Sequence, residues 1–389
     1  MPARYLNKTK LEAELFKCLN CVAKPCHRAC PLKCSPKEFI AKAKEKDFAG
    51  AVASICATNP LPHICGLICP EHFCMNACLR GRIDHPINIP AVQATLIENG
   101  RKDFLPCPTK LNGLKIAVIG AGPAGMAAAW KARLLGLQVT IFEKENKIGG
   151  TLNLIPPNRL PQKAVLDDWT HIKALGGIDI CFNSCQTTPK KLLEDGFNGV
   201  IVTTGEQTGL TLGIEGEELT VSYTDYLKNP TQYATKGKVG IIGGGNVATD
   251  CALTAKELGA SEVLLFIRRK IFDMKVSLSE IAALIENKID LVTTTRVCQI
   301  KKGNNRLTVL TCTTQKEGEG YEDVKSSTIQ RQNFDLIIKA IGAKKAPTAD
   351  EPNIIYAGDR KTGSSTVAEA AASGIEAAEK LYHYLKGER

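Results

Sequence analysis

Ten of the sixteen cysteines lie between residues 18 and 78, in two runs with short, regular spacings. The runs read Cys18-x2-Cys21-x4-Cys26-x3-Cys30-Pro31 and Cys65-x3-Cys69-Pro70-x3-Cys74-x3-Cys78. Thiolates at intervals of three to five residues, with a proline directly after a ligand, are typical of iron–sulfur clusters. The proline fixes φ and stops the chain from continuing as a helix, so that it turns at the ligand. The runs therefore predict iron–sulfur ligation.

Cysteines at such spacings can also bind zinc or form a disulfide framework. CxxC pairs also bind zinc, and His63, His72 and His85 lie close enough to contribute, but the spacings need no histidine. A secreted disulfide framework suits short chains with small cores, whereas this chain has 389 residues. We expect a reduced, cytoplasmic protein, in which Cys107, Cys251, Cys298 and Cys312 are core or surface thiols.

Composition excludes several other classes. There is no run of about 18 apolar residues and no apolar signal segment, so we expect no membrane span and no secretion. The formal net charge is +10, and residues 1–110 hold 16 Lys/Arg against 9 Asp/Glu. No aromatic-rich basic stretch accompanies this charge, so we expect no nucleic-acid binding. A basic face around clusters is also suited to an acidic electron-transfer partner.

The chain changes character near residue 110. Before it, LEAELFKCLN and PKEFIAKAKEKDFAGAVASICA have the periodicity of amphipathic helices. After a linker, LKIAVIG-GAGPAG and KVGIIG-GGN each lead from a buried strand through a glycine turn into a helix. The tail from residue 353 reads as strand, glycine loop and long helix. We expect it to complete the first nucleotide domain, which makes the second an insertion.

The first glycine loop, Gly120 to Gly125, has the context of a dinucleotide fingerprint, because a strand precedes it and a helix follows. Glycines let the pyrophosphate approach the helix N-terminus, whose N–H groups favour an anion. Glu143, at the end of the next strand, is placed to accept from a ribose hydroxyl. Ala357-Gly358-Asp359 has the position of a flavin-contacting strand end.

The second loop runs from Gly243 through Gly244, Gly245 and Asn246 to Val247 and Ala248. Its following strand ends at Arg268, Arg269 and Lys270, where the first unit has an acidic residue. Basic residues there favour a ribose 2′-phosphate, although a solvent-exposed basic turn is an equal alternative. The choice between NADPH and NADH stays open.

CLNCVAKPCHRACP, NPLPHICGLICP, PINIPAVQ, GAGPAG, GGTLNLIPPNRLP, GGGNVATD, FIRR and AGD occur in this order over nearly the whole chain. Together they resemble the electron-input half of dihydropyrimidine dehydrogenase and the related small subunit of glutamate synthase. The resemblance implies two [4Fe–4S] clusters, FAD, and NADPH or NADH. The implied fold is α/β: two Rossmann-like dinucleotide-binding domains, with the NAD(P) domain inserted in the FAD domain, preceded by an α-helical double-cluster domain.

The resemblance also implies site residues. One cluster is held by Cys18, Cys21, Cys26 and Cys78, and the other by Cys30, Cys69, Cys74 and Gln93. Cys34 and Cys65 fall outside these sets. The spacing between Cys69 and Cys74 is one residue shorter than in mammalian members. The implied nucleotide-binding residues are Gly120, Ala121, Gly122, Pro123, Ala124, Gly125, Glu143, Lys144, Gly150, Thr151, Arg159, Gly244, Gly245, Asn246, Val247, Arg268, Arg269, Lys275, Ala340, Gly342, Gly358, Asp359 and Thr366.

The implied domains are a cluster domain over 1–110, an FAD domain over 111–207 plus 343–389, and an NAD(P)H domain over 208–342. Nothing in the sequence resembles an FMN barrel. We therefore expect an NAD(P)H-oxidising subunit that passes electrons through FAD and clusters to an FMN-containing partner, which reduces uracil or thymine. No acid–base residue is needed for hydride transfer between bound cofactors. The alternatives are a glutamate synthase small subunit with its large subunit, an oxidoreductase with a ferredoxin-type acceptor, or a nucleotide-sensing scaffold without turnover.

Overall fold

The computed structural model describes residues 4–100, 107, 110–185, 188–205, 209–274, 276–303, 306–324, 327–342 and 348–387. The chain divides into two compact units. The larger holds the spans 2–153, 157–207 and 345–389, and the smaller holds 208–344 with the short segment 154–156. Among the described residues, no helix has both the length and the apolar character needed to cross a membrane.

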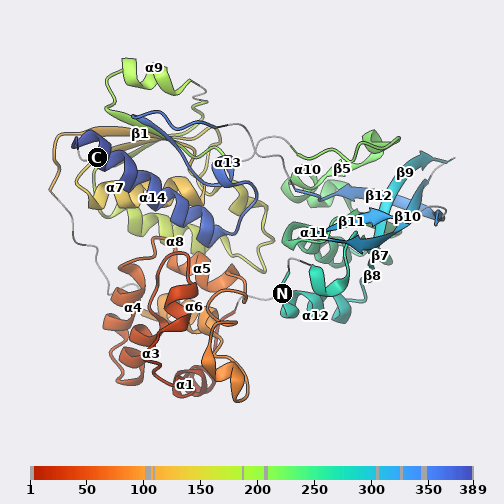
Figure 1. Ribbon diagram of the computed structural model, residues 1–389, viewed down its shortest axis with the longest axis horizontal. Coiled ribbons are helices and arrows are strands. Elements are labelled where there is room, and N and C mark those ends of the chain that lie inside the picture. Colours follow the sequence, from red (N-terminus) through yellow and green to blue (C-terminus); the bar gives the residue numbers. More distant parts are fainter. Residues whose placement is uncertain are drawn as a thin grey trace. The chain divides into compact units, whose positions relative to one another are not determined.

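The larger unit begins with a bundle of short helices that carries the ten clustered cysteines (Figure 1). Their apolar faces meet in a core that includes Phe39, Val52, Ile55 and Val92. Short helices suit this region because prolines begin three of them and cysteine-bearing turns separate them. The elements are α1 Lys8–Phe16, α2 Pro25–Ala29, α3 Pro36–Lys44, α4 Phe48–Cys56, α5 Pro62–Ile68, η1 Leu79–Arg82 and α6 Ile89–Gly100.

The amphipathic stretch 36–57 is helical as expected, and the structure divides it into two helices, α3 and α4. Lys46 has φ of +65°, which ends α3 with a left-handed turn. Asp47 then begins α4 by accepting a hydrogen bond from Gly50 N at 2.8 Å. A charged KEKD stretch with a good N-cap stops a helix that the apolar periodicity alone would continue.

The second part of the larger unit is a five-stranded parallel sheet with helices packed against it (Figure 1). Its order is β13-β4-β1-β2-β3, so the C-terminal strand pairs with β4, as expected from the tail. The strands are β1 Lys115–Ile119, β2 Gln138–Phe142, β3 Ile178–Cys181, β4 Gly199–Val202 and β13 Ile354–Tyr356. The helices are α7 Pro123–Leu134, η3 Gly150–Leu154, α8 Gln162–Lys173, α9 Pro189–Glu194, α13 Asp359–Thr362 and α14 Val367–Leu385.

Helices α7 and α14 lie side by side and bring two distant sequence segments together (Figure 1). Their backbones approach so closely that a Cβ at Gly374 would lie 2.1 Å from Ala124 O. A Cβ at Gly358 would likewise lie 2.7 Å from the Ala124 side chain. The C-terminal Ala-Gly-Asp segment is thereby fixed against the first turn of α7.

The smaller unit has an eight-stranded mixed sheet with strand order β11-β10-β12-β6-β7-β8, in which β5 also pairs with β12 and β9 with β10. Strands β6 and β7 form the parallel core, and helix α11 packs on it through residues such as Cys251 and Ala252. The strands are β5 Val221–Ser222, β6 Lys238–Ile242, β7 Glu262–Phe266, β8 Asp290–Val292, β9 Thr295–Lys302, β10 Leu307–Glu317, β11 Gly320–Asp323 and β12 Ile329–Lys339. The helices are η4 Glu217–Leu219, α10 Tyr223–Lys228, η5 Pro230–Tyr233, α11 Asn246–Glu257, η6 Ile271–Asp273 and α12 Leu278–Glu286.

Candidate redox site

Four cysteines line one small cavity in the helical bundle, which we name the first cysteine cavity. They are Cys18, Cys21, Cys26 and Cys78, and the cavity volume is about 30 Å³. Local structure explains how they converge. Helix α1 ends at Phe16, and Lys24 takes a left-handed conformation before Pro25 begins α2. Cys18 and Cys21 lie in the connection between α1 and α2, and Cys26 lies in the first turn of α2. All three line the cavity together with Cys78, which is distant in sequence. The donor set fits an iron–sulfur cluster, because four thiolates are its usual ligands.

A second set of sulfurs gathers deeper in the bundle, and we name it the second cysteine group: Cys30, Cys34, Cys65, Cys69 and Cys74. Three of them are buried and two are partly exposed. Burial raises the pKa of Cys65 and Cys74 well above the ordinary value, and the neighbouring Cys69 thiol adds to the effect. Buried thiols such as Cys65 and Cys74, whose ionisation burial and a neighbouring thiol oppose, suit a metal that would stabilise the thiolates.

Cys30 is the thiol of the second cysteine group that is most ready to ionise. A hydrogen bond from the Cys34 side chain lowers the pKa of Cys30 to about 6. The same bond, together with burial, raises the pKa of Cys34 well above its usual value. Cys34 thus supports Cys30 as a neutral donor. Sequence spacing does not predict the Cys30–Cys34 hydrogen bond, because Cys34 continues the same regular spacing as the cysteines before it.

Gln93, the non-cysteine residue of the implied second ligand set, lies on α6 and is buried. Its Nε2 donates to Pro62 O at 2.7 Å. Pro62 begins α5, the helix that carries Cys65 and leads to Cys69. The bond therefore fixes the Gln93 amide next to the segment that presents the second cysteine group.

The second cysteine group lies close to the flavin-type fold of the same unit. Burial raises the pKa of Cys69 to about 12, and the negative charge of Glu369 on α14 contributes. Arg4 Nη1 donates to Cys69 O at 2.7 Å. Glu369 closes the capping box that begins α14 at Thr366. The N-terminal turn of α14 and the second cysteine group are thus neighbours, which sequence separation hides.

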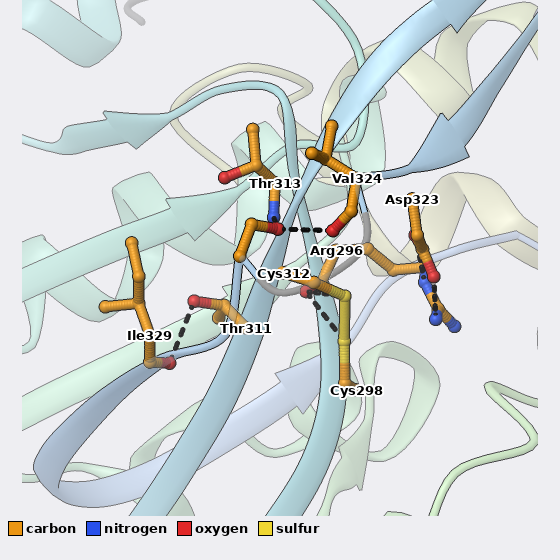
Figure 2. Close-up of a disulfide and its surroundings, with 9 residues drawn as sticks. Arg296, Cys298, Thr311, Cys312, Thr313, Asp323, Val324 and Ile329 are labelled. Atoms are coloured by element: carbon orange, nitrogen blue, oxygen red, sulfur yellow. Dashed lines mark hydrogen bonds and ion pairs between the residues drawn. A yellow bond between two sulfur atoms is a disulfide. The ribbon is translucent and has the colours of Figure 1, made fainter.

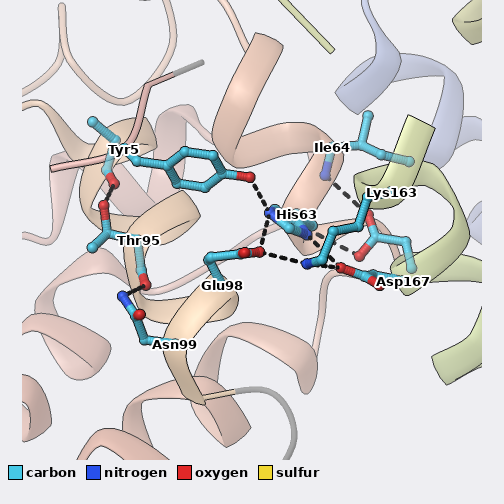
Figure 3. Close-up of polar contacts among 10 residues, drawn as sticks. Tyr5, His63, Ile64, Thr95, Glu98, Asn99, Lys163 and Asp167 are labelled. Atoms are coloured by element: carbon cyan, nitrogen blue, oxygen red, sulfur yellow. Dashed lines mark hydrogen bonds and ion pairs between the residues drawn. The ribbon is translucent and has the colours of Figure 1, made fainter. Parts of the chain in front are cut away.

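A polar network around the buried His63 joins the helical bundle to α8 (Figure 3). His63 is almost fully buried, and its Nε2 lies 2.7 Å from Tyr5 Oη. Glu98 Oε2 and Asp167 Oδ2 each lie 3.4 Å from a ring nitrogen of His63. Lys163 Nζ bridges these two carboxylates at 2.9 and 2.8 Å.

The position of Lys163 bears on whether this network is a metal site. The ligand atoms of His63, Glu98 and Asp167 lie within 4.8 Å of one another, a geometry compatible with a cation. The Lys163 ammonium already supplies positive charge to both carboxylates. We therefore interpret it as an ion-pair network that connects α6 and α8, and not as a metal site. His63 was close enough in sequence to the cysteines to be a zinc ligand, but its ring contacts Tyr5, Glu98 and Asp167.

Asp168, the next residue of α8, holds the backbone of the same region. Its Oδ1 accepts from His63 N at 3.2 Å, and its Oδ2 accepts from Ile64 N at 3.0 Å. These N–H groups belong to the first turn of α5, which has no intrahelical partner for them. A fully buried carboxylate of α8 therefore caps the helix that carries Cys65. No local sequence pattern predicts this contact, because Asp168 lies more than 100 positions from His63 and Ile64.

The first glycine loop is shaped to admit a pyrophosphate. Gly120 has φ of +103°, and a Cβ on Gly125 would lie 1.9 Å from Gly120 O. Gly122 caps α7 and faces open space. The loop therefore presents the N–H groups of α7 with no side chain in the way, as a bound phosphate requires.

Among the other candidate residues of this fold, Glu143 and Gly150 lie at the loop. Glu143 is buried, and its Oε2 accepts from Ala121 N at 2.7 Å, so the carboxylate lies at the loop itself. A Cβ on Gly150 would lie 3.2 Å from Gly122 Cα, and Lys144 and Thr151 are exposed nearby in sequence. Arg159 is buried. Asp359 Oδ1 accepts from Ser365 Oγ at 2.5 Å, and Thr366 Oγ1 caps α14.

The second glycine loop repeats this geometry in the smaller unit. Gly243 has φ of +152°, and a Cβ there would lie 2.3 Å from Ala340 O. Gly245 caps α11 and faces open space. Asn246 Oδ1 is buried and has no hydrogen-bond partner among the described residues, as expected of an atom that meets a ligand.

The residues around the second loop are placed differently. Val247 and Arg268 are exposed, and Arg269 is partly exposed. Gly342 has φ of +91° and accepts from Leu210 N through its carbonyl. Lys275 lies outside the described residues.

The smaller unit also corrects one expectation. Cys298 and Cys312 are not the free thiols that the sequence predicts but form a disulfide with a Cα–Cα distance of 6.5 Å (Figure 2). They lie on the paired strands β9 and β10, where the register shifts between Leu310 and Thr311. Cys298 is the extra residue of this bulge, so the local irregularity lets the two sulfurs meet. Fourteen residues separate the pair in sequence, which hides their proximity.

Comparison with known families assigns both parts of the chain. Residues 3–103 match the family described as dihydropyrimidine dehydrogenase domain II, 4Fe-4S cluster. Residues 114–354 match the pyridine nucleotide-disulphide oxidoreductase family. The chain belongs to this second family, and its N-terminal extension is a 4Fe-4S domain of the dihydropyrimidine dehydrogenase type.

Individual relatives agree with this assignment. The chain is 31% identical to the NAD-dependent dihydropyrimidine dehydrogenase subunit PreT of Escherichia coli K12, covering 96% of this chain and 94% of PreT. It is 28% identical to the NADP(+)-dependent formate dehydrogenase subunit beta of Moorella thermoacetica, covering 94% of this chain and 60% of that subunit.

Solved structures show the same fold. FprA of Mycobacterium tuberculosis in complex with NADPH aligns with a TM-score of 0.62 at 15% identity, over 70% of this chain and 85% of FprA. A 2-naphthoyl-CoA reductase aligns with a TM-score of 0.58 at 20% identity, over 90% of this chain and 52% of the reductase.

These findings confirm the expected class. The protein is an NAD(P)H-dependent oxidoreductase subunit for electron input, with FAD and 4Fe-4S clusters as its cofactors. The α/β fold with Rossmann-like domains and an N-terminal cluster domain is confirmed as well.

Proposed function

We propose that this chain is the NAD(P)H-oxidising subunit of a dihydropyrimidine dehydrogenase, working with an FMN-containing catalytic partner that reduces uracil or thymine. The observation that carries the proposal is the match with PreT, which extends over 94% of that subunit's length. By comparison, the match covers only 60% of the formate dehydrogenase subunit and 49% of the NADPH-Fe(3+) oxidoreductase subunit. The match that covers nearly the whole of both this chain and PreT favours the pyrimidine partner.

We assign the cofactors to the domains expected from sequence: clusters to 1–110, FAD to 111–207 plus 343–389, and the nicotinamide nucleotide to 208–342. Cys18, Cys21, Cys26 and Cys78 would hold one cluster, and Cys30, Cys69, Cys74 and Gln93 the other. When bound, FAD accepts electrons in pairs and the clusters conduct them singly.

The protein's own residues position these groups and keep them apart from water. The Gly120–Gly125 loop and the N-terminus of α7 would receive the FAD pyrophosphate. Glu143 already holds the loop through Ala121 N, so its second role would be to accept from the ribose. Gly358 and Thr366 would face the flavin from the C-terminal segment, next to the second cysteine group.

In the smaller unit, Gly244, Gly245 and Asn246 would receive the nicotinamide nucleotide, with the unpaired Asn246 Oδ1 as a polar contact. The exposed Arg268 and the partly exposed Arg269 are available to a 2′-phosphate. If they bind it, Arg268→Ala should raise KM for NADPH about tenfold and leave KM for NADH unchanged, since charged hydrogen bonds contribute about 1.5–3 kcal/mol. Equal effects on both nucleotides would contradict a role in phosphate recognition.

The central test is reconstitution. The chain should be co-expressed anaerobically with an FMN-containing pyrimidine reductase subunit, purified, and assayed for NAD(P)H-dependent reduction of uracil. We expect a stable complex with FAD, FMN and about eight irons from the two clusters of the subunit, plus any in the partner. Reduction of an artificial dye without any uracil reduction would reject the pyrimidine partner and keep the electron-input role.

A further inference from the structure

Large apolar side chains are exposed around the first cysteine cavity. Phe16 is 76% exposed, Val22 is 93% exposed, and Leu19 lies between them with a partly exposed side chain. All three fall within seven residues that include Cys18 and Cys21. Single exposed apolar residues are ordinary, but a contiguous group of them marks an interaction surface.

Two lysines join this apolar group and place it at the cavity. Lys44 Nζ lies 6.0 Å from the centroid of the Phe16 ring and donates to Cys18 O at 3.3 Å. Lys37 Nζ donates to Cys21 O at 3.4 Å and also lines the first cysteine cavity, as Leu19 does. Phe16, Leu19, Lys37 and Lys44 are thereby tied to the cavity or to its cysteines, and the exposed Val22 directly follows Cys21. We name these five residues the exit patch.

The charge around the exit patch has one predominant sign. Lys24, Lys37 and Arg80 line the cavity, and within the described chain no carboxylate does. Glu38 and Asp84 pair with Lys24 and Arg80 at its margin. Residues 1–50 hold 11 Lys/Arg against 5 Asp/Glu, a net charge of +6. Lys37 and Lys44 form no ion pair with a carboxylate among the described residues, so the patch keeps a positive charge beside its apolar side chains. This combination fits a protein partner with an apolar contact surrounded by carboxylates.

We propose that the exit patch is the docking surface for an acidic electron-accepting protein. The proposal rests on the proposed function for the direction of transfer, out of the chain. One NAD(P)H reduces two one-electron acceptors and releases NAD(P)+ and one proton, so the balance needs no further reactant. The first cysteine cavity lies directly beneath the patch, so a partner bound there is brought next to Cys18 and Cys21.

The test uses the holoprotein and two haem proteins of opposite charge, acidic cytochrome b5 and basic cytochrome c. Binding is measured by surface plasmon resonance at several salt concentrations, and the rate of haem reduction by absorbance. We expect cytochrome b5 to bind at least about tenfold more tightly than cytochrome c at low salt, with an affinity that falls as salt rises. Equal or reversed preference would overturn the proposal.

Charge reversal locates the surface. Lys37→Glu with Lys44→Glu should weaken cytochrome b5 binding about tenfold or more, because attraction becomes repulsion. Lys190→Glu with Lys191→Glu, on exposed α9, makes the same change in net charge away from the patch and should have little effect. Iron content is measured on each variant, so that loss of a cluster is not mistaken for loss of docking. Equal weakening by both pairs would mean a general charge effect and would overturn the patch.

Val22→Ser tests the apolar centre without touching a charge or a cavity-lining side chain. It should weaken cytochrome b5 binding about threefold to tenfold, whereas Ile285→Ser, at an exposed site on α12, should leave it unchanged. No difference between the two would reject the apolar contact. These outcomes do not depend on uracil: failed docking with intact pyrimidine reduction rejects the patch alone, and the reverse rejects the pyrimidine partner alone.

Discussion

The first cysteine cavity and the second cysteine group arise from the same kind of motif, yet their surroundings differ. All four cysteines of the first cavity are partly exposed, and apolar and cationic side chains surround them at the surface. In the second group three thiols are buried, and burial raises the pKa of Cys69 to about 12. Glu369 and Asp168, both from the nucleotide-binding fold, act on this group. The difference shows that the second group lies inside the bundle next to the nucleotide-binding fold, whereas the first lies at the surface.

A ligand series should show the largest effect. Cys69→Ser should lose about half of the iron, because one of two clusters fails to assemble, and should abolish delivery to a protein acceptor. Cys65→Ser is the matched control: Cys65 is buried in the same group but outside the implied ligand set. It should keep the iron. Iron analysis and the visible spectrum measure both variants, and iron loss from Cys65→Ser would revise the ligand set.

Removal of the Asp168 carboxylate should have the next largest effect. Asp168→Ala leaves the N–H groups of His63 and Ile64 buried without their acceptor, which should cost about 3 kcal/mol. Asp167→Ala should cost less than about 1 kcal/mol, because this neighbour is half-exposed and pairs near the surface. Denaturant unfolding of the holoprotein measures both. Similar losses would show that the buried cap is no more important than the surface pair.

The packing of the two regions also differs. A Cβ on Gly66 would lie 2.7 Å from Ala94 N, so Gly66→Ala must push α5 away from α6. We expect a loss of about 1–3 kcal/mol, typical of overpacking. A Cβ on Gly81, which follows the cavity-lining Arg80, would lie 3.5 Å from Pro86 Cδ, an ordinary contact distance. Gly81→Ala should therefore be close to neutral. Thermal unfolding compares the variants, and an unaffected Gly66→Ala protein would mean that α5 is free to shift.

The smallest expected effect is on pH dependence. Burial lowers the pKa of His63, although Asp168 and Glu98 oppose this. Between the lowered value and the unfolded value of about 6.5, the unfolded chain binds more protons, so stability rises with pH through this window and falls on acidification. We expect a loss of about 1 kcal/mol or less below pH 6.

His63→Phe is the control for that effect, because it removes the titrating ring from a buried site. Lys163, Asp167 and Tyr5 also face the ring, and Tyr5 stays protonated because its pKa is raised to about 12. The melting temperature of wild type should decline from pH 7.5 to pH 5.5 more steeply than that of the variant. Parallel curves would assign the pH dependence to other groups.

Local sequence signals predicted much of the fold. The two strand–glycine–helix units, the cysteine runs and the strand at Ile354–Tyr356 all appear where expected, because hydrophobic period and glycine turns act over short distances. The continuous periodicity of residues 36–57 would by itself extend one helix over the whole stretch. Lys46 and Asp47 end it, since a left-handed turn and an N-cap override that pattern.

By itself, the sequence determined the chemistry: thiolates in cluster-type spacing, two glycine loops that admit phosphates, and a family in which these parts occur together. The tertiary structure alone decided which cysteines are inner and which are outer. It placed Asp168 beneath α5, Glu369 beside Cys69, and Cys298 against Cys312. The physical reason is range. Spacing fixes what neighbours along the chain can bind, whereas burial and charge depend on residues that folding brings from as far as 300 positions away, as between Cys69 and Glu369.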